Sequence, residues 1–171
     1  LYDTFVLSLC ANHRALLVSK YLKKHSEYKP GIIYSTWLQV PAYAAILLNR
    51  KLKNKCYTVS RAHGFDVYSQ RHKTGYIPYH RRLYDELDEI SAISSDGKKY
   101  LESKYGNRNK VVVRRLGASD LNKINPDSGR DCIRLVSCSR VIPLKRLERI
   151  ADALGQIKDI PIHWTHLGGG D

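Results

Sequence analysis

The sequence predicts an α/β protein with parallel, Rossmann-like sheets. Short apolar runs alternate with segments whose apolar residues recur at helical spacing, and this alternation stops at the turn-rich stretch 122–131 and then begins again. Strands that alternate with helices form parallel sheets through right-handed crossovers. We therefore expect a first domain over residues 1–121, a linker over 122–131, and the start of a second domain over 132–171.

The first domain is expected to open with an amphipathic helix, because apolar side chains recur there at helical spacing. These side chains are Phe5, Val6, Leu9, Cys10, His13, Leu16 and Leu17. Pro30-Gly31 then breaks the chain before a short apolar strand at 32–34. A second helix is expected from Trp37 to about Leu52, with Pro41 tolerated in its first turn.

Three further strands are expected in the first sheet. They lie at 56–60, 90–93 and 111–113. The loop 61–66 follows the first of these strands, and a short helix near Leu87 precedes the second. Between the last two strands we expect a helix that is capped by Ser95 or Asp96 and ended by Gly106.

The second domain shows a strand, a turn and a helix that together suit a phosphate group. Its expected elements are a strand at 133–137, a helix at 144–154 with Leu147, Ile150 and Ala151 on one face and Gly155 as its end, and a strand at 160–165. Arg140 and Lys145 lie in the turn that follows the first strand. Parallel α/β proteins bind ligands at this edge, where helix-start N–H groups attract phosphate.

Composition and charge limit the class of protein. The 171 residues are 43% hydrophobic and 26% charged, as in a globular chain, and the net charge of +13 indicates an anionic partner. Because no apolar run could span a bilayer and no basic signal region opens the chain, we expect a cytoplasmic protein. The sequence has no methionine, so we interpret it as a fragment, and its four scattered cysteines are expected to be reduced and mostly buried.

Four segments, in order along the chain, resemble the glycosyltransferases of family 4, which have the two-domain GT-B architecture. Segment 135–147 resembles the family's strand, G/S-R-x-x-x-x-K turn and helix, and 167–171 is similar to its G-x-G turn, with Asp171 where many members carry Pro. The loop 61–66 matches the family's H-G/H-D loop, and 116–120 resembles its N-G-V-D segment. The resemblance implies the rear of an acceptor domain followed by the front of a donor domain. The family's glycine-rich opening loop and its acidic E-x7-E segment have no counterpart in this sequence.

This resemblance implies a retaining glycosyltransferase that moves a hexose from a nucleotide-sugar donor to a saccharide or lipid-linked acceptor, in cell-surface polysaccharide biosynthesis. Negative charge grows on the leaving diphosphate in such a reaction and needs preorganised cations. Arg140 can bind two phosphate oxygens and Lys145 adds a point charge, so neither a metal ion nor another cofactor is required. Because the acidic E-x7-E segment is missing, we expect this chain by itself to be inactive.

The other candidate residues take their roles from the same resemblance. His63 is expected to act with Arg140 and Lys145 as a catalytic residue that contacts the donor sugar from the acceptor side. Gly64 and Asp66 belong to the acceptor-side loop, and Asp66 suits a loop-capping role equally well. The glycines that could let the backbone approach the donor diphosphate, or could form a plain turn, are Gly168, Gly169 and Gly170.

An aromatic and basic cluster lies beside the acceptor-side loop. Its members are Tyr76, Tyr79, His80, Arg81 and Arg82. In family 4 such a surface often faces a lipid-linked acceptor, so attachment to an anionic membrane surface on the cytoplasmic face is one hypothesis. An ordinary solvated loop is the other.

Two other functions stay open at the level of sequence. The +13 charge and twelve tyrosines suit a nucleic-acid-binding module, but the sequence has no recognition motif and its basic residues are spread over many elements, so we expect no nucleic-acid partner. A GT-B-type sugar-nucleotide epimerase would share the architecture. It would need catalytic acids in the acceptor domain, where the loops show no obvious pair.

Overall fold

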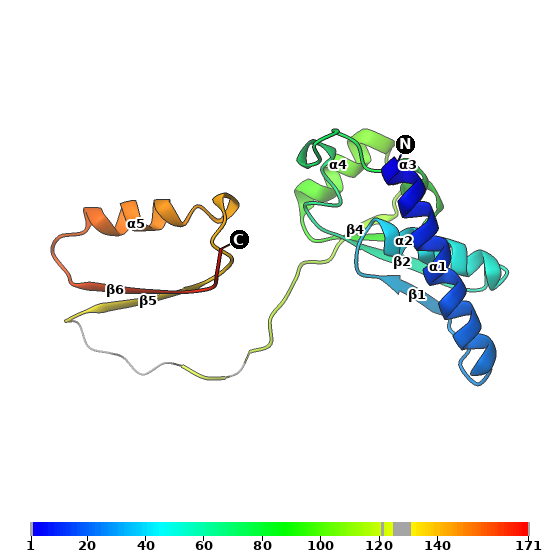
Figure 1. Ribbon diagram of the computed structural model, residues 1–171, viewed down its shortest axis with the longest axis horizontal. Helices are drawn as coiled ribbons and strands as arrows, with labels where there is room; N and C mark the ends of the chain where they lie inside the picture. Colours follow the sequence, from blue (N-terminus) through cyan, green and yellow to red (C-terminus); the bar gives the residue numbers. More distant parts are fainter. Residues whose placement is uncertain (1, 121, 125–130, 171) are drawn as a thin grey trace. The chain divides into compact units, whose positions relative to one another are not determined.

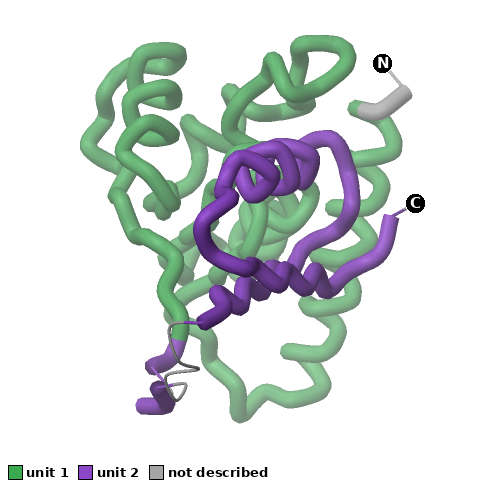
Figure 2. Tube along the Cα trace, turned by 90° about the vertical axis from the view of Figure 1, so that its left-hand side faces the viewer, with its two compact units in different colours: residues 1–118 green, residues 119–171 purple. Residues whose placement is uncertain are grey.

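The computed structural model describes residues 2–120, 122–124 and 131–170 (Figure 1). It forms two compact units, unit 1 over Leu1–Ala118 and unit 2 over Ser119–Asp171 (Figure 2). Each unit holds one sheet, and all strand pairs in both sheets are parallel, which confirms the predicted fold class. Residues 125–130 of the expected linker lie outside the described residues.

Unit 1 contains a four-stranded sheet in the order β1-β2-β3-β4. Its strands are β1 Ile32–Ser35, β2 Tyr57–Ala62, β3 Glu89–Ala92 and β4 Val111–Val113. Its helices are α1 Tyr2–Lys24, α2 Val40–Lys51, α3 His80–Glu86 and α4 Ser95–Tyr105, with a short 3-10 helix η1 at Ser69–Arg71. Because each strand pairs with the next one in sequence, right-handed crossovers place the connecting helices on the same face of the sheet.

The core of unit 1 lies between these helices and one face of the sheet. The strands contribute the fully buried Ile90, Ala92 and Val111, and the helices contribute Leu83 and Leu101. Side chains alternate along each strand, so the residues between these positions lie on the opposite face. That face is polar and aromatic: Arg61 donates to the Tyr34 hydroxyl at 2.8 Å, and Arg114 contacts both carboxylate oxygens of Glu89 at 2.9 and 3.1 Å.

Helix α1 buries a different face from the one that the sequence pattern indicates. Leu7, Ala11 and Ala15 are 9%, 0% and 1% exposed, whereas Phe5 and Leu9 are 63% and 54% exposed. The other expected positions, Val6, Cys10, His13, Leu16 and Leu17, are exposed as well. Small residues four apart form a flat stripe that allows α1 to pack closely on α2. The face of α1 that was predicted from its large apolar side chains is therefore wrong.

The ends of α4 explain where this helix starts and stops. Its N-cap is Ser94, whose Oγ accepts the Gly97 N–H at 3.1 Å, one residue before the expected Ser95. The expected end is confirmed, because Gly106 follows the last turn with a φ of +90° that favours glycine.

Unit 2 contains two parallel strands and one helix. Strand β5 Ile133–Cys138 pairs with β6 Ile162–Leu167, and the 3-10 helix η2 Pro143–Lys145 precedes α5 Leu147–Gln156. Helix α5 starts later than expected because Arg146 adopts left-handed angles, φ 51° and ψ 45°, that separate it from η2. Lys145 is therefore in the 3-10 turn and not in the helix.

Two further details of α5 differ from the prediction. Gly155 lies inside the helix, which continues to Gln156. Leu147, Ile150 and Leu154 are half-buried, while Ala151 is exposed. The buried face thus follows positions i, i+3 and i+7, the spacing of an amphipathic helix on a sheet.

The four cysteines are all free thiols. Cys56 is buried, and burial raises the pKa of its thiol. Cys10 and Cys138 are exposed, so the expectation of mostly buried cysteines is wrong for these two. Cys10 is exposed because it lies on the same face of α1 as the large apolar side chains, and the packing of unit 1 leaves this face uncovered.

Candidate functional site

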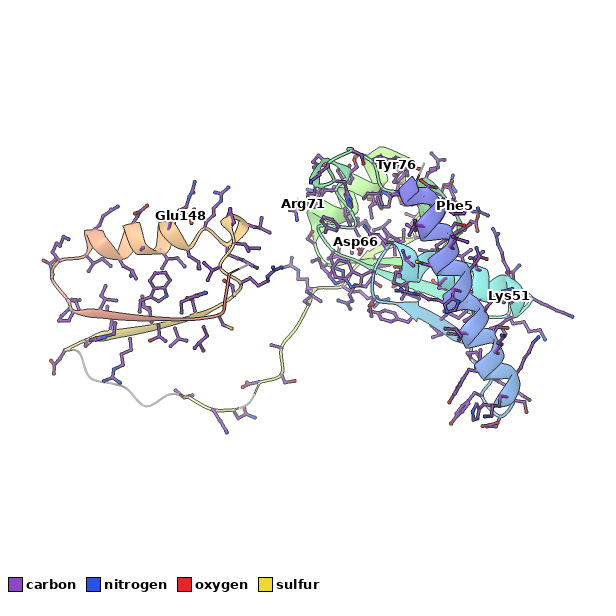
Figure 3. All side chains as sticks on the ribbon, in the orientation of Figure 1. Phe5, Lys51, Asp66, Arg71, Tyr76 and Glu148 are labelled. Atoms are coloured by element: carbon purple, nitrogen blue, oxygen red, sulfur yellow. The ribbon has the colours of Figure 1, made fainter. Side chains whose placement is uncertain are left out.

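The loop after β2 is held by Asp66, whose side chain is fully buried (Figure 3). The His63 N–H donates to Asp66 Oδ1 at 2.6 Å, and the Leu38 N–H donates to Asp66 Oδ2 at 2.7 Å. One carboxylate therefore fastens the loop to the turn before α2. This geometry gives Asp66 the loop-capping role that the sequence left open beside an acceptor-site role.

The imidazole of His63 lies on the ring of Trp37, with ring centroids 4.5 Å apart. Its Nδ1 is 3.7 Å from Asp66 Oδ2, which is an electrostatic contact but too long for a hydrogen bond. The His63 side chain is 22% exposed. His63 is thus a fixed and partly accessible ring at the carboxyl edge of the first sheet, where α/β proteins bind their ligands.

Gly64 allows a guanidinium to lie against this loop. A Cβ at Gly64 would be 2.5 Å from Nη1 of Arg71, and the Arg71 guanidinium also lies over the Tyr68 ring, 5.1 Å from its centroid. The sequence pattern marks neither Arg71 nor Trp37. Trp37 reaches the His63 ring because a separate segment packs on the loop, whereas Arg71 follows the loop closely in sequence and bends back onto it.

The segment that resembles N-G-V-D begins beside the start of α4. A cavity of about 430 Å³ at the carboxyl ends of β3 and β4 is lined by Ser94, Asp96, Arg115 and Leu116, among others. This cavity shares the sheet edge with His63, because the carboxyl ends of parallel strands lie at one edge.

The aromatic and basic cluster does assemble around a cavity, of about 550 Å³, to which α4 adds Lys104 and Tyr105. Its cations are partly neutralised, because Arg81 bonds to Asp85 and Arg82 to Glu86, each at 2.7 Å. His80 is only 3% exposed and so is part of the core rather than of the surface. Burial first, and then the charge of Lys104, lowers the pKa of His80 to about 4.

An apolar groove lies next to this cluster, along the first half of α1. It measures about 420 Å³ and is lined by Val6, Cys10, Phe65, Lys73 and Tyr76, among others. Phe65 and Tyr76 are 51% and 57% exposed. None of the helices within the described ranges is long and apolar enough to cross a bilayer.

In unit 2 the glycine run lies directly beside the Arg140 turn. The Ser139 N–H donates to the Leu167 carbonyl at 3.1 Å, and the Val141 N–H donates to the Gly169 carbonyl at 2.8 Å. The two segments therefore continue side by side beyond the ends of β5 and β6. Gly168 has a φ of +142°, and a Cβ there would overlap the Ser139 carbonyl oxygen, so this position requires glycine.

A compact hydrogen-bonded turn connects Arg140 to Lys145. The Arg140 carbonyl accepts the Ile142 N–H at 3.1 Å, and the Ile142 carbonyl accepts the Lys145 N–H at 2.9 Å. Both basic side chains are exposed. The structure thus brings Arg140 and the predicted glycines together, and it places Lys145 one short turn away at the same end of the sheet.

Comparisons with protein-family models and with curated proteins gave no match. Among solved structures, the chain is similar to MnaA from S. aureus, determined together with UDP, with a TM-score of 0.53 at 14% sequence identity. The similarity covers 94% of this chain and 47% of that chain, so this chain spans about half the length of the structure it matches. The fold is α/β with parallel Rossmann-like sheets and resembles half of the GT-B-type fold of MnaA.

This likeness, at 14% identity, is one of fold. It agrees with the GT-B architecture that the motifs imply, and it leaves the roles of His63, Arg140 and Lys145 as predictions. Within the described part of the chain, no three or more His, Cys, Asp or Glu side chains form a group that could hold a metal ion.

Proposed function

We propose that this chain is part of a glycosyltransferase that uses a nucleotide-sugar donor, and that the turn after β5 binds the donor diphosphate. The observation that supports this most is the pairing of the Arg140 turn with the glycine run at the carboxyl edge of β5 and β6. Glycines at a strand end let a phosphate approach the backbone closely. The fold likeness to a structure determined with UDP supports a nucleotide ligand.

Each basic residue has a distinct part in this proposal. As the bond between the sugar and the diphosphate breaks, negative charge collects on the leaving phosphate oxygens. The planar guanidinium of Arg140 can donate two parallel hydrogen bonds to these oxygens, while Lys145 supplies a mobile positive charge. A hexose would pass in this way to a saccharide or lipid-linked acceptor with retention of configuration.

Unit 1 would supply the acceptor side and unit 2 the donor side. His63 is the catalytic candidate in unit 1, because its ring packs on Trp37 and its backbone N–H donates to Asp66, while part of the side chain stays accessible at the ligand-binding edge. Asp66 and Gly64 act by shaping this loop. A substitution of His63 would therefore affect turnover without changing diphosphate binding.

Calorimetry with pyrophosphate, UDP and GDP on the purified chain tests the diphosphate site. Arg140→Ala and Lys145→Ala should each raise the Kd by about ten- to a hundredfold, since a hydrogen bond to a charged group contributes about 1.5–3 kcal/mol. Lys158→Ala is the matched control, because Lys158 is an exposed cation beyond the other end of α5. Equal affinities of the wild type and the Arg140 and Lys145 variants would refute the proposal.

We also propose that unit 1 attaches to an anionic membrane surface through the groove along α1. The groove combines exposed apolar side chains with Lys73, the combination that suits the boundary between lipid headgroups and acyl chains. Flotation with vesicles that contain anionic lipid should recover the chain, and Phe65→Ala with Tyr76→Ala should reduce the recovery. Leu144→Ala, which removes an exposed apolar side chain from unit 2, is the control. Recovery that does not respond to salt or to these variants would argue against attachment.

A GT-B-type sugar-nucleotide epimerase is the second candidate, because the fold likeness to MnaA fits such an enzyme as well as a transferase. An epimerase needs acids that face the sugar, whereas the buried Asp66 already accepts two backbone hydrogen bonds. Because this chain by itself is expected to be inactive, incubation of the longer protein that contains it with UDP-hexoses in D2O separates the two functions. Deuterium in the recovered sugar ring would favour the epimerase.

A further inference from the structure

Three polar side chains form a continuous hydrogen-bonded chain behind the Arg140 turn. Trp164 Nε1 donates to Ser137 Oγ at 2.9 Å, and Ser137 Oγ lies 2.8 Å from His166 Nδ1. His166 Nε2 in turn lies 3.0 Å from the Ser139 carbonyl oxygen. The side chains of Ser137, Trp164 and His166 are all half-buried on one face of the two-stranded sheet.

If the imidazole is neutral, the chemistry of these groups fixes the direction of every hydrogen bond. A carbonyl oxygen only accepts, so His166 Nε2 carries a proton and donates it to Ser139. An indole N–H only donates, so Ser137 Oγ accepts from Trp164 and gives its own proton to His166 Nδ1. A neutral imidazole protonated at Nε2 satisfies every member of the chain. A histidine with only a packing role would not need a hydrogen-bond partner at each ring nitrogen.

The series of hydrogen bonds ends at the Ser139 carbonyl, where the backbone of the candidate site is most closely packed. The Ser139 carbonyl that His166 holds is the same group that excludes a Cβ at Gly168. The C=O and N–H groups of a trans peptide point in opposite directions, and no cis peptide occurs among the described residues. Holding the Ser139 carbonyl therefore restrains the orientation of the Ser139–Arg140 peptide, which is bonded directly to the Arg140 Cα.

We propose that His166 is a positioning residue for diphosphate binding. Through its Nε2–H it orients the peptide that carries Arg140, and Ser137 and Trp164 hold the imidazole in the required tautomer. His166 acts through the Ser139 carbonyl and does not touch the ligand. This inference rests on the proposed function, because it assumes that Arg140 binds a diphosphate.

Two amide substitutions separate the two ends of the imidazole. In His166→Gln the terminal amide can replace the Nε2–H donor to Ser139, whereas in His166→Asn the shorter side chain reaches only as far as Nδ1. We expect the Kd for inorganic pyrophosphate to stay within about twofold in His166→Gln and to rise about tenfold in His166→Asn. His163→Gln and His163→Asn are the matched controls, since His163 is exposed on the opposite face of β6.

The outcomes distinguish this inference from the function on which it rests. Wild-type chain that fails to bind pyrophosphate overturns both. Wild-type chain that binds pyrophosphate, with equal affinity in both His166 variants, overturns only the positioning role. If His166→Asn fails to fold by circular dichroism, the long-range 15N–1H NMR spectrum of the wild-type imidazole decides: protonation at Nε2 supports the role, and protonation at Nδ1 overturns it.

Discussion

Asp66 shows at the scale of one residue how a buried carboxylate shapes a ligand-binding loop. It receives backbone N–H groups from His63 and Leu38, which belong to two different segments. A buried N–H without an acceptor is costly, so the loop conformation depends on this side chain. The sequence left an acceptor-side role and a loop-capping role open for Asp66, and the two hydrogen bonds support the loop-capping one.

Substitution of Asp66 should therefore lower stability, because the backbone N–H groups of His63 and Leu38 would lose their acceptor. We expect Asp66→Ala to reduce the free energy of unfolding by about 2–4 kcal/mol, measured by urea denaturation. Asp66→Asn should cost clearly less, because its amide oxygen still accepts one of the two N–H groups. Equal losses in the two variants would show that the carboxylate acts by its charge instead.

The buried His80 predicts a pH dependence of stability. Its pKa falls from 6.5 to about 4 in the folded chain, so the folded state resists protonation that the unfolded state accepts. The unfolded chain therefore binds more protons between these two pH values, and the free energy of unfolding should drop by about 3 kcal/mol as pH falls from 6.5 to 4. His80→Gln, which does not titrate, should lose this part of the slope in denaturation at several pH values. If the free energy of unfolding fell with pH by the same amount in the wild type and in His80→Gln, the prediction would be wrong.

Residues such as Trp37, Arg71 and His166 mark the limit of sequence reasoning at this scale. Arg140 and His63 could be predicted as site residues because each stands in a local motif, and their roles stay predictions. Trp37 reaches the His63 ring, and His166 reaches Ser139, only through tertiary packing, while Arg71 reaches Gly64 through a bend of the chain near η1. A contact between residues far apart in sequence leaves no spacing that can be read from one chain.

At the scale of elements, strand and helix order followed from the apolar pattern, but helix faces and ends did not. Helix α1 packs through Ala11 and Ala15, which a search for large apolar side chains overlooks. Helix α5 starts after Arg146, and no turn signal in the sequence predicted the left-handed backbone of this residue. Periodicity thus predicts that an element exists better than it predicts which residues the element buries.

The N-cap of α4 offers a test at this scale. Ser94→Ala removes the acceptor of the Gly97 N–H and should lower the free energy of unfolding by about 1 kcal/mol. Ser95→Ala, one residue inside the helix and exposed, should change it by less than about 0.5 kcal/mol. Chemical denaturation of the two variants measures the difference. A larger loss of unfolding free energy in Ser95→Ala than in Ser94→Ala would show that Ser95 is the N-cap instead.

At the scale of the whole molecule, the restart of the alternating pattern after residue 131 predicted two parallel sheets, and both are present. The pattern could not show which face of the unit 1 sheet the helices of the described residues cover. The net charge of +13 also predicted an anionic ligand without locating it. Within the described residues, the pairing of 139–141 with 167–169 indicates one edge where such a ligand would bind.

The central claim is that this edge binds the diphosphate of a sugar nucleotide, and a titration of UDP into the 15N-labelled chain, followed by amide NMR, tests it most directly. We predict that the largest shifts fall on the amides of 139–142 and 168–170, and that Arg140→Ala removes them. Shifts that are absent from both segments, or that are confined to the Tyr76–Arg82 cluster of unit 1, would contradict the claim.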